Sequence, residues 1–379
     1  MIVGIDATNI RVGGGVAHLK GILQCVPFDA FQISKIVVWG DPATLRQLPD
    51  HTCISKVASA SVKTPVLEKL HWQFLGLARE ASVAGCDVLL IPGGIYLGSF
   101  RPFVAMVQNM QVFEWRELRR EGISKITLRL LMLQVLQGLT FLRANGILFL
   151  SNYCREYFGR HFPWLLRDKR IAIIPHGIVM TSMRKEIKPL GSFSEKNPQT
   201  ILYVSTVKNY KHHWNLIDGV GILRRRGFPV ELSLVGGGDK GATRKMRAAI
   251  DRNRDVGGYV HYHGDQSHES TLKFFEAADL FAFPSTCETF GISLLEAMSY
   301  GLPIACSRYG PMPELLGDAG VYFDPLDSDS IASSLQELLL DLELQKRLSG
   351  TAITRAKTYT WSECSTATFG LLQEAWKQA

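Results

Sequence analysis

Residues 280–303 read LFAFPSTCETFGISLLEAMSYGLP, and this stretch decides the fold. A short apolar run predicts a buried strand, a turn containing Gly291 follows it, and an apolar segment resumes beyond the turn with helical character. A strand, a turn and a helix in this order form the repeating unit of a parallel α/β sheet. The first N–H groups of such a helix are unpaired and attract phosphate.

Two glutamates bracket this turn, eight positions apart. Glu296 falls inside the predicted helix, where its carboxylate could accept hydrogen bonds from two adjacent hydroxyls, as on a ribose. Glu288 precedes the glycine and would face hydroxyls of the group that a diphosphate carries. Two surface glutamates often occur at this spacing by chance, but Phe290-Gly291 and the later Gly-Leu-Pro favour a binding site.

The same alternation of short apolar runs and helical patterns covers most of the chain. It predicts an α/β protein with two Rossmann-like, doubly wound domains that face a cleft. The first domain spans residues 1–185, a linker rich in polar residues, Gly and Pro spans 186–199, and the second domain spans 200–360. Residues 361–379 form a helix that is predicted to pack back on the first domain. Strands are expected at 2–5, 36–39, 88–91, 104–107, 146–150, 171–174, 201–205, 230–235, 259–263, 280–283, 304–306 and 321–323.

Composition bounds the class of protein. The chain has 379 residues, 46% of them hydrophobic and 20% charged, which is typical of a globular protein. Residues 1–190 hold 23 Lys and Arg against 13 Asp and Glu, so the whole net charge of +7 resides in the first half. Seven scattered cysteines without a CxxC motif indicate reduced thiols and a cytoplasmic protein. No nucleic-acid-binding motif accompanies the positive charge.

Lysines follow the first predicted strand of the second domain. That strand ends at Thr206, and Lys208 and Lys211 come next, where either could neutralise a diphosphate. A glycine turn that begins at Gly236 closes the following strand and would lie at the same edge of the sheet. Each feature alone also fits an ordinary solvated loop.

The first domain carries its own glycine turn, in which Gly14 and Gly15 would let the backbone approach a ligand. The turn is not GxGxxG, so it lacks the dinucleotide fingerprint. Asp327 and Asp329 look like a metal-binding pair, but they precede a predicted helix, where Asp is an ordinary cap. The sequence therefore predicts no metal site and no bound cofactor.

The second half resembles the family 4 glycosyltransferases, which are retaining enzymes of the GT-B fold. The likeness is carried by the Glu-x7-Glu segment from Glu288 to Glu296, by the glycine turn at Gly236, and by Phe323-Asp324-Pro325. It implies that Lys211 binds the donor diphosphate, Glu288 a donor sugar hydroxyl and Glu296 the ribose. It also implies that main-chain N–H groups of three consecutive residues hold sugar and phosphates: Phe290, Gly291 and Ile292. The glycine loop of the first domain would close over the diphosphate without a metal.

Two positions depart from the family pattern. Thr206 stands where the family usually has Arg, and Gln108 stands where the family often has a His at the end of a strand of the first domain. Gln108 can hydrogen-bond a sugar hydroxyl but cannot transfer a proton as an acid or base. The resemblance implies transfer of a hexose or deoxyhexose from a nucleotide diphosphate sugar, in polysaccharide or O-antigen synthesis. The alternatives are a nucleotide-sugar epimerase of the same fold and a non-catalytic partner subunit.

A basic segment points to the acceptor. Arg116, Arg119, Arg120, Lys125 and Arg129 lie just before and within an apolar helix pattern. Such a segment suits a lipid-linked saccharide acceptor and peripheral contact with the anionic inner face of the cell membrane. Gln134 and Gln137 interrupt the apolar stretch, which argues against a spanning helix. A solvated helix face is the alternative for the same pattern.

Overall fold

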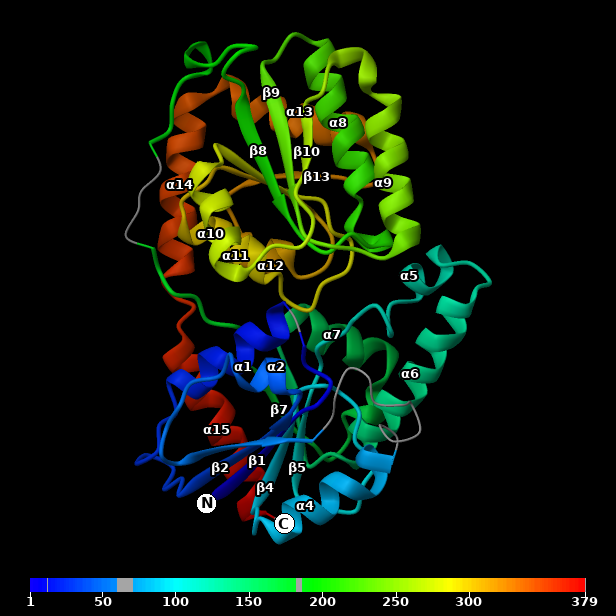
Figure 1. The fold of residues 1–379 in the computed structure, drawn as a ribbon, viewed down its shortest axis with the longest axis vertical. Coiled ribbons are helices and arrows are strands. Elements are labelled where there is room, and N and C mark those ends of the chain that lie inside the picture. The colour runs from blue at the N-terminus through cyan, green and yellow to red at the C-terminus, as the bar shows by residue number, and fades with distance from the viewer. Residues whose placement is uncertain (12, 60–70, 182–185, 379) are drawn as a thin grey trace. The chain divides into compact units, whose positions relative to one another are not determined.

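The chain folds into two compact units in a computed structural model that describes residues 1–11, 13–59, 71–181 and 186–378 (Figure 1). One unit comprises residues 1–177 and 359–379, and the other comprises residues 178–358. The first boundary therefore lies at Gly177, not at 185. Residues 186–199 belong to the second unit, where Arg224 donates to Glu195 (2.7 Å) and Ser194 pairs with Asn197.

The first unit is built on a parallel sheet of seven strands in the order β3-β2-β1-β4-β5-β6-β7. The central strands are buried over nearly their whole length, as in a sheet covered on both faces. The strands are β1 (Ile2–Ala7), β2 (Lys35–Gly40), β3 (Ile54–Ala58), β4 (Val88–Ile91), β5 (Phe103–Met106), β6 (Gly146–Phe149) and β7 (Arg170–Ile173).

Helices cover this sheet, and the last of them comes from the end of the chain. In α15 the Ser365 hydroxyl donates to the Ile22 carbonyl of α1 (2.8 Å), and Phe369 and Leu372 are fully buried. The helices of this unit are α1 (Gly14–Gln24), α2 (Pro42–Leu45), a π-helical turn (Trp72–Gly76) with α4 (Leu77–Val83), α5 (Trp115–Arg120), α6 (Lys125–Arg143), α7 (Asn152–His161) and α15 (Trp361–Lys377).

The second unit holds a parallel sheet of six strands in the order β10-β9-β8-β11-β12-β13. Its strands are β8 (Gln199–Val204), β9 (Val230–Val235), β10 (Val260–Tyr262), β11 (Leu280–Phe283), β12 (Ile304–Ser307) and β13 (Val321–Phe323). Its helices are α8 (His213–Arg225), α9 (Lys240–Arg252), α10 (His268–Ala277), α11 (Ile292–Ser299), α12 (Met312–Leu316), α13 (Ser328–Leu340) and α14 (Leu342–Ala356).

Both sheets have the strand order of a doubly wound α/β domain, in which the order reverses beside the first strand. The prediction of two Rossmann-like domains is therefore confirmed. The prediction that they face a cleft stays a prediction.

Several elements differ from the sequence-based expectation. The pattern over residues 331–348 predicts one helix, but the structure has two, because the Asp341 side chain accepts from Leu344 N–H (2.9 Å) and starts a new helix. Strand β3 and the short helices α2 and α5 were not predicted. The sequence pattern also predicts a helix over residues 68–81, of which residues 68–70 lie outside the described residues.

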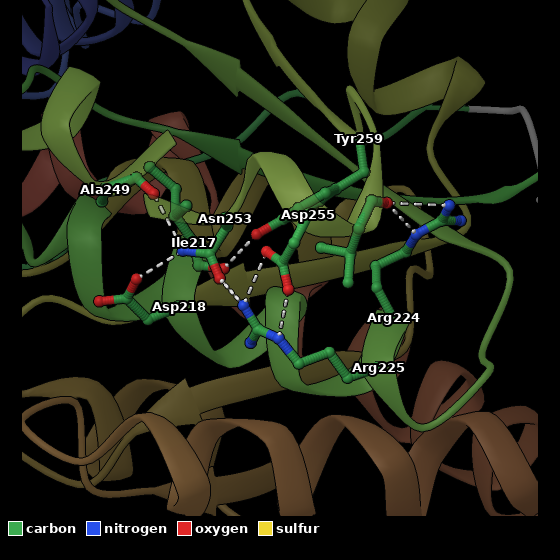
Figure 2. Close-up of polar contacts among 9 residues, drawn as sticks. Ile217, Asp218, Arg224, Arg225, Ala249, Asn253, Asp255 and Tyr259 are labelled. Atoms are coloured by element: carbon green, nitrogen blue, oxygen red, sulfur yellow. Dashed lines mark hydrogen bonds and ion pairs between the residues drawn. The ribbon is translucent and has the colours of Figure 1, made fainter. Parts of the chain in front are cut away.

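A polar cluster braces the second unit at the edge where its strands begin (Figure 2). Arg225 donates to both carboxylate oxygens of Asp255 (3.0 and 3.1 Å) and to Asn253 (2.9 Å). Asn253 in turn donates to Asp218 (2.7 Å), and the Tyr259 hydroxyl donates to the Ile217 carbonyl (2.8 Å). These contacts tie α8 to the segment between α9 and β10, at the edge opposite the carboxyl ends of the strands, where ligands bind in such sheets.

Candidate active site

The candidate site of the second unit lies where its strand order reverses, between β8 and β11. These two strands pair in parallel. The connection after β8 leads to β9, its neighbour on one side, and the connection after β11 leads to β12, in the opposite direction along the sheet. In doubly wound domains a crevice opens at this point, beyond the carboxyl ends of the strands. The segment after β8 carries Lys208 and Lys211, and the segment after β11 carries Glu288.

Lys211 and Glu288 meet at this crevice. The Lys211 ammonium donates to Oε1 of Glu288, and both side chains are largely buried. The ammonium also lies 5.4 Å from the ring centroid of Tyr210 and 5.6 Å from that of Phe283. Ring faces attract an ammonium group, so these two rings help to fix the position of the Lys211 side chain.

Backbone and side-chain bonds join the two segments that carry this pair. Thr286 N–H donates to the Tyr210 carbonyl (2.9 Å), and the Thr286 hydroxyl lies 3.1 Å from Nε2 of His212. The Tyr203 hydroxyl, on β8, donates to the carbonyl of Lys211 (3.0 Å). His212 adopts the left-handed conformation (φ 47°), which turns the chain sharply into α8.

Helix α11 presents its amino end beside these residues. Gly291 caps it at φ 102°, a conformation that favours glycine, and its carbonyl accepts from Leu294 and Leu295. The N–H groups of Ile292 and Ser293 stand at the first two helical positions, which lack intrahelical acceptors. Phe290 is buried just before the turn. Such a helix start could hold phosphate oxygens.

Glu296 lies one turn further along α11, with its side chain 12% exposed. Burial raises the pKa of this carboxyl to about 7, because the charged form loses hydration. Nδ1 of His268 lies 3.9 Å from Oε1 of this carboxyl. A carboxylate with this little hydration would be stabilised by ligand hydroxyls that donate to it.

The glycine turn after β9 packs against the segment that follows β8. Gly236 has φ 128°, and a Cβ atom there would lie 2.2 Å from the Ser205 carbonyl oxygen. Gly236 N–H donates to the Gly264 carbonyl, and Val207 N–H donates to the Gly237 carbonyl (2.7 Å). Thr206 is exposed between these contacts. The turn therefore supports the loop that carries the lysines.

The first unit brings Gly15 and Gln108 together. Gly13 precedes α1 at φ 66°, and α1 begins at Gly14. A Cβ on Gly15 would lie 3.5 Å from Oε1 of Gln108, which follows β5. The glycine turn after β1 and the polar side chain after β5 thus form one half-buried patch at the carboxyl edge of this sheet.

Asp327 caps helix α13, where its carboxylate accepts from Asp329 N–H (3.0 Å). Among the residues that the structure describes, no group of three or more His, Cys, Asp and Glu side chains is arranged to hold a metal ion.

Comparison with known proteins gives the fold a name. Residues 185–355, less than half of the chain, match the model of the family described as glycosyl transferases group 1. O-antigen chain mannosyltransferase B of Escherichia coli is 31% identical over 170 residues, which are 44% of this chain and 44% of that protein. The chain therefore spans less than half the length of this curated relative.

Solved structures extend the likeness to the whole chain. Sucrose-phosphate synthase of Thermosynechococcus elongatus superposes with a TM-score of 0.76 at 16% identity, over 100% of both chains. HepE of Anabaena, in complex with UDP-glucose, gives 0.74 at 18% identity, over 99% of this chain and 100% of that one. At these identities the likeness shows the fold alone.

The fold is GT-B. Residues 185–355 are similar to that glycosyltransferase family, and the chain as a whole shares its fold with the solved structures. The matched residues coincide closely with the second unit, which holds Lys211, Glu288 and Glu296.

The GT-B second unit also contains site residues that the sequence did not single out. Tyr210 lies between the two lysines, with the Lys208 ammonium 5.9 Å and the Lys211 ammonium 5.4 Å from its ring. Thr286 joins the two loops, and His268 lies beside Glu296. Tyr210 could have been found from its place between the lysines, whereas the other two carry no local signal.

Proposed function

We propose that the protein is a retaining glycosyltransferase of family 4. It moves a hexose or deoxyhexose from a nucleotide diphosphate sugar to a lipid-linked saccharide, in cell-surface polysaccharide or O-antigen synthesis. The observation that carries the proposal is the Lys211–Glu288 pair at the reversal of strand order, beside the amino end of α11. The names of the relatives, a mannosyltransferase of the O-antigen chain and a protein crystallised with UDP-glucose, support the substrate class.

The residues divide the donor between them. Lys211, aided by Lys208, neutralises the diphosphate, and the N–H groups of Ile292 and its neighbours bind its oxygens. Glu296 accepts hydrogen bonds from the ribose hydroxyls. The Lys211 ammonium and the Glu288 carboxylate are in contact. A diphosphate bound to Lys211 would therefore place the sugar that it carries beside Glu288. The fixed cation and helix amides carry the charge of the leaving group, so the proposal includes no metal.

The reaction exchanges one bond at the anomeric carbon. The bond to the diphosphate oxygen breaks, and its electron pair stays on the nucleoside diphosphate. The acceptor hydroxyl oxygen bonds to the same face of the sugar, which retains the configuration. Its proton passes to a phosphate oxygen. Gln108, beside Gly15, would orient a sugar hydroxyl, since an amide cannot act as an acid or base at neutral pH.

We also propose a cytoplasmic location, peripheral to the inner face of the cell membrane. All seven cysteines are free thiols, as expected of a protein in a reducing compartment. The surplus of positive charge in residues 1–190 suits an anionic surface.

A binding screen tests the donor site. Calorimetry with UDP-, GDP- and dTDP-sugars identifies the donor, and Lys211→Met is expected to weaken its binding about 10- to 100-fold, the value of a charge-assisted contact. Lys196→Met, at an exposed lysine of the same unit, is the matched control and should leave affinity unchanged. Unchanged affinity in Lys211→Met would show that the site is assigned wrongly.

Turnover tests the reaction itself. Mass spectrometry of mixtures with lipid-linked acceptors should show one added sugar, and NMR should show an anomeric configuration equal to that of the donor. Thr206 and Gln108 give a specific reason to consider a non-catalytic partner subunit, which would bind donor without transfer to any acceptor. A changed sugar without an acceptor would instead identify an epimerase.

A further inference from the structure

Helix α6 (Lys125–Arg143) presents an apolar face that the described residues of the first unit leave exposed. Seven of its apolar side chains are between 39% and 71% exposed. At 100° per residue all of them except Ile126 form one continuous stripe along the helix, opposite the buried face that contains Leu130, Gln137 and Phe141. We call these six residues the α6 stripe: Leu128, Leu131, Met132, Val135, Leu139 and Leu142. A large apolar patch on an otherwise polar surface marks an interaction site.

The contacts of the opposite face show how α6 is held. By length and composition alone this helix could cross a membrane. However, the Thr140 hydroxyl is hydrogen-bonded to both N–H and carbonyl of Tyr96 (2.9 and 3.2 Å), and Arg143 donates to the Gly98 carbonyl (2.6 Å). The Phe141 ring packs against Phe113 and Phe158 in the core. These contacts keep α6 on the surface of the first unit, which is the position of an interfacial helix and not of a spanning one.

The exposed charged residues of α5 and α6 are all basic. Helix α6 contains three charged residues, Lys125, Arg129 and Arg143, and none is acidic. Lys125 and Arg129 are exposed near its start. The neighbouring helix α5 (Trp115–Arg120) adds exposed Arg116 and Arg119, and Trp115 is itself exposed. Basic side chains and tryptophan at the edge of an apolar face are the composition of helices that lie in anionic bilayers.

We propose that the α6 stripe lies in the interface of a membrane that carries anionic lipid, with the basic residues of α5 and α6 on the headgroup phosphates. A second copy of the chain is a poorer occupant, because a two-fold contact matches a surface with itself and these exposed cations would gain no acidic partner from α6. The inference deepens the proposed function, since a lipid-linked acceptor is found at such a surface, but it does not depend on turnover.

Vesicle co-sedimentation tests the surface. The full-length protein is mixed with vesicles of phosphatidylcholine alone and with vesicles that contain phosphatidylglycerol, and binding is expected only or chiefly to the latter. The variant Leu128→Gln/Val135→Gln should lower the partition coefficient at least tenfold, because it removes apolar area from the bilayer. Leu340→Gln, at an exposed leucine of the second unit, is the matched control and should bind like wild type.

The charged rim is tested separately. Lys125→Gln and Arg129→Gln should each lower binding to the anionic vesicles about fivefold, and the effect should shrink as salt is added. Circular dichroism and nucleotide affinity of each variant verify that the fold is intact. Wild-type protein that binds neither vesicle, or stripe variants that bind as wild type does, would overturn the proposal.

Two further outcomes distinguish the possible occupants and the two proposals. If the stripe variant converts a dimer to a monomer in sedimentation without losing vesicle binding, the stripe is a contact between copies and the proposal is wrong. If wild-type protein binds anionic vesicles through the α6 stripe but transfers no sugar, the membrane-binding proposal is supported and the proposed reaction is wrong.

Discussion

At the scale of single residues, the pairing of Lys211 with Glu288 explains more than either residue does alone. They stand 77 positions apart, and the reversal of strand order between β8 and β11 brings them into contact. Sequence reasoning selected both residues but assigned them separate tasks. Their contact means that recognition of the phosphate and recognition of the sugar share one spot, so a change at either residue should disturb both.

Glu296 gives a prediction about pH. Its pKa of about 7 means that the carboxylate, the form that accepts two hydroxyl hydrogen bonds, is mostly absent at pH 6 and mostly present at pH 8. Affinity for the donor sugar nucleotide should therefore rise up to about tenfold between pH 6 and pH 8. Calorimetry at both pH values measures this affinity. The ligand is a sugar nucleotide, because its phosphates do not titrate between pH 6 and pH 8.

Glu296→Gln is the control for that pH dependence. It should bind donor weakly and equally at both pH values, whereas Glu337→Gln, at an exposed residue of α13, should keep the wild-type slope. A pH dependence that survives in Glu296→Gln would show that another group titrates.

At the scale of elements, the glycine turn after β9 is important for packing, because it lies directly against the segment that follows β8. Gly236→Ala would place a Cβ atom 2.2 Å from the Ser205 carbonyl at φ 128°. The loop that carries the lysines would have to shift, so the variant should lose about 2–4 kcal/mol of unfolding free energy in the second unit. Denaturant titration measures this loss. Gly258→Ala, where a Cβ meets nothing within 4 Å, should cost under about 1 kcal/mol.

The same scale shows what the sequence could predict. Strand β11 is an uninterrupted apolar run, and β9 is an apolar run interrupted only by Glu231 and Ser233; the ranges of both were predicted to the residue. The break at Asp341 was missed because apolar residues continue at helical spacing across it, and only the cap bond to Leu344 reveals it. The Thr286 contacts were also beyond sequence reasoning, because they depend on which strands become neighbours.

At the scale of the whole molecule, the two units differ in how the chain builds them. The second unit is one continuous segment, 178–358, whereas the first needs residues 359–379 to complete it. Helix α15 buries Phe369, Leu371 and Leu372 against the first sheet and α1. Three buried side chains of this size contribute about 5–9 kcal/mol, which is comparable to the whole stability of a domain.

Removal of residues 359–379 should therefore unfold the first unit and leave the second folded. Hydrogen exchange should show lost protection in β1, β4 and β5, while β8, β9 and β11 stay protected and the second unit still binds the donor nucleotide. A matched variant with Leu371 and Leu372 changed to Ala in the full-length chain should reproduce the effect in part, since it creates cavities in the same core. Loss of protection in both sheets together would mean that the units fold as one cooperative body, and the division at Gly177 and Thr358 would then have no thermodynamic meaning.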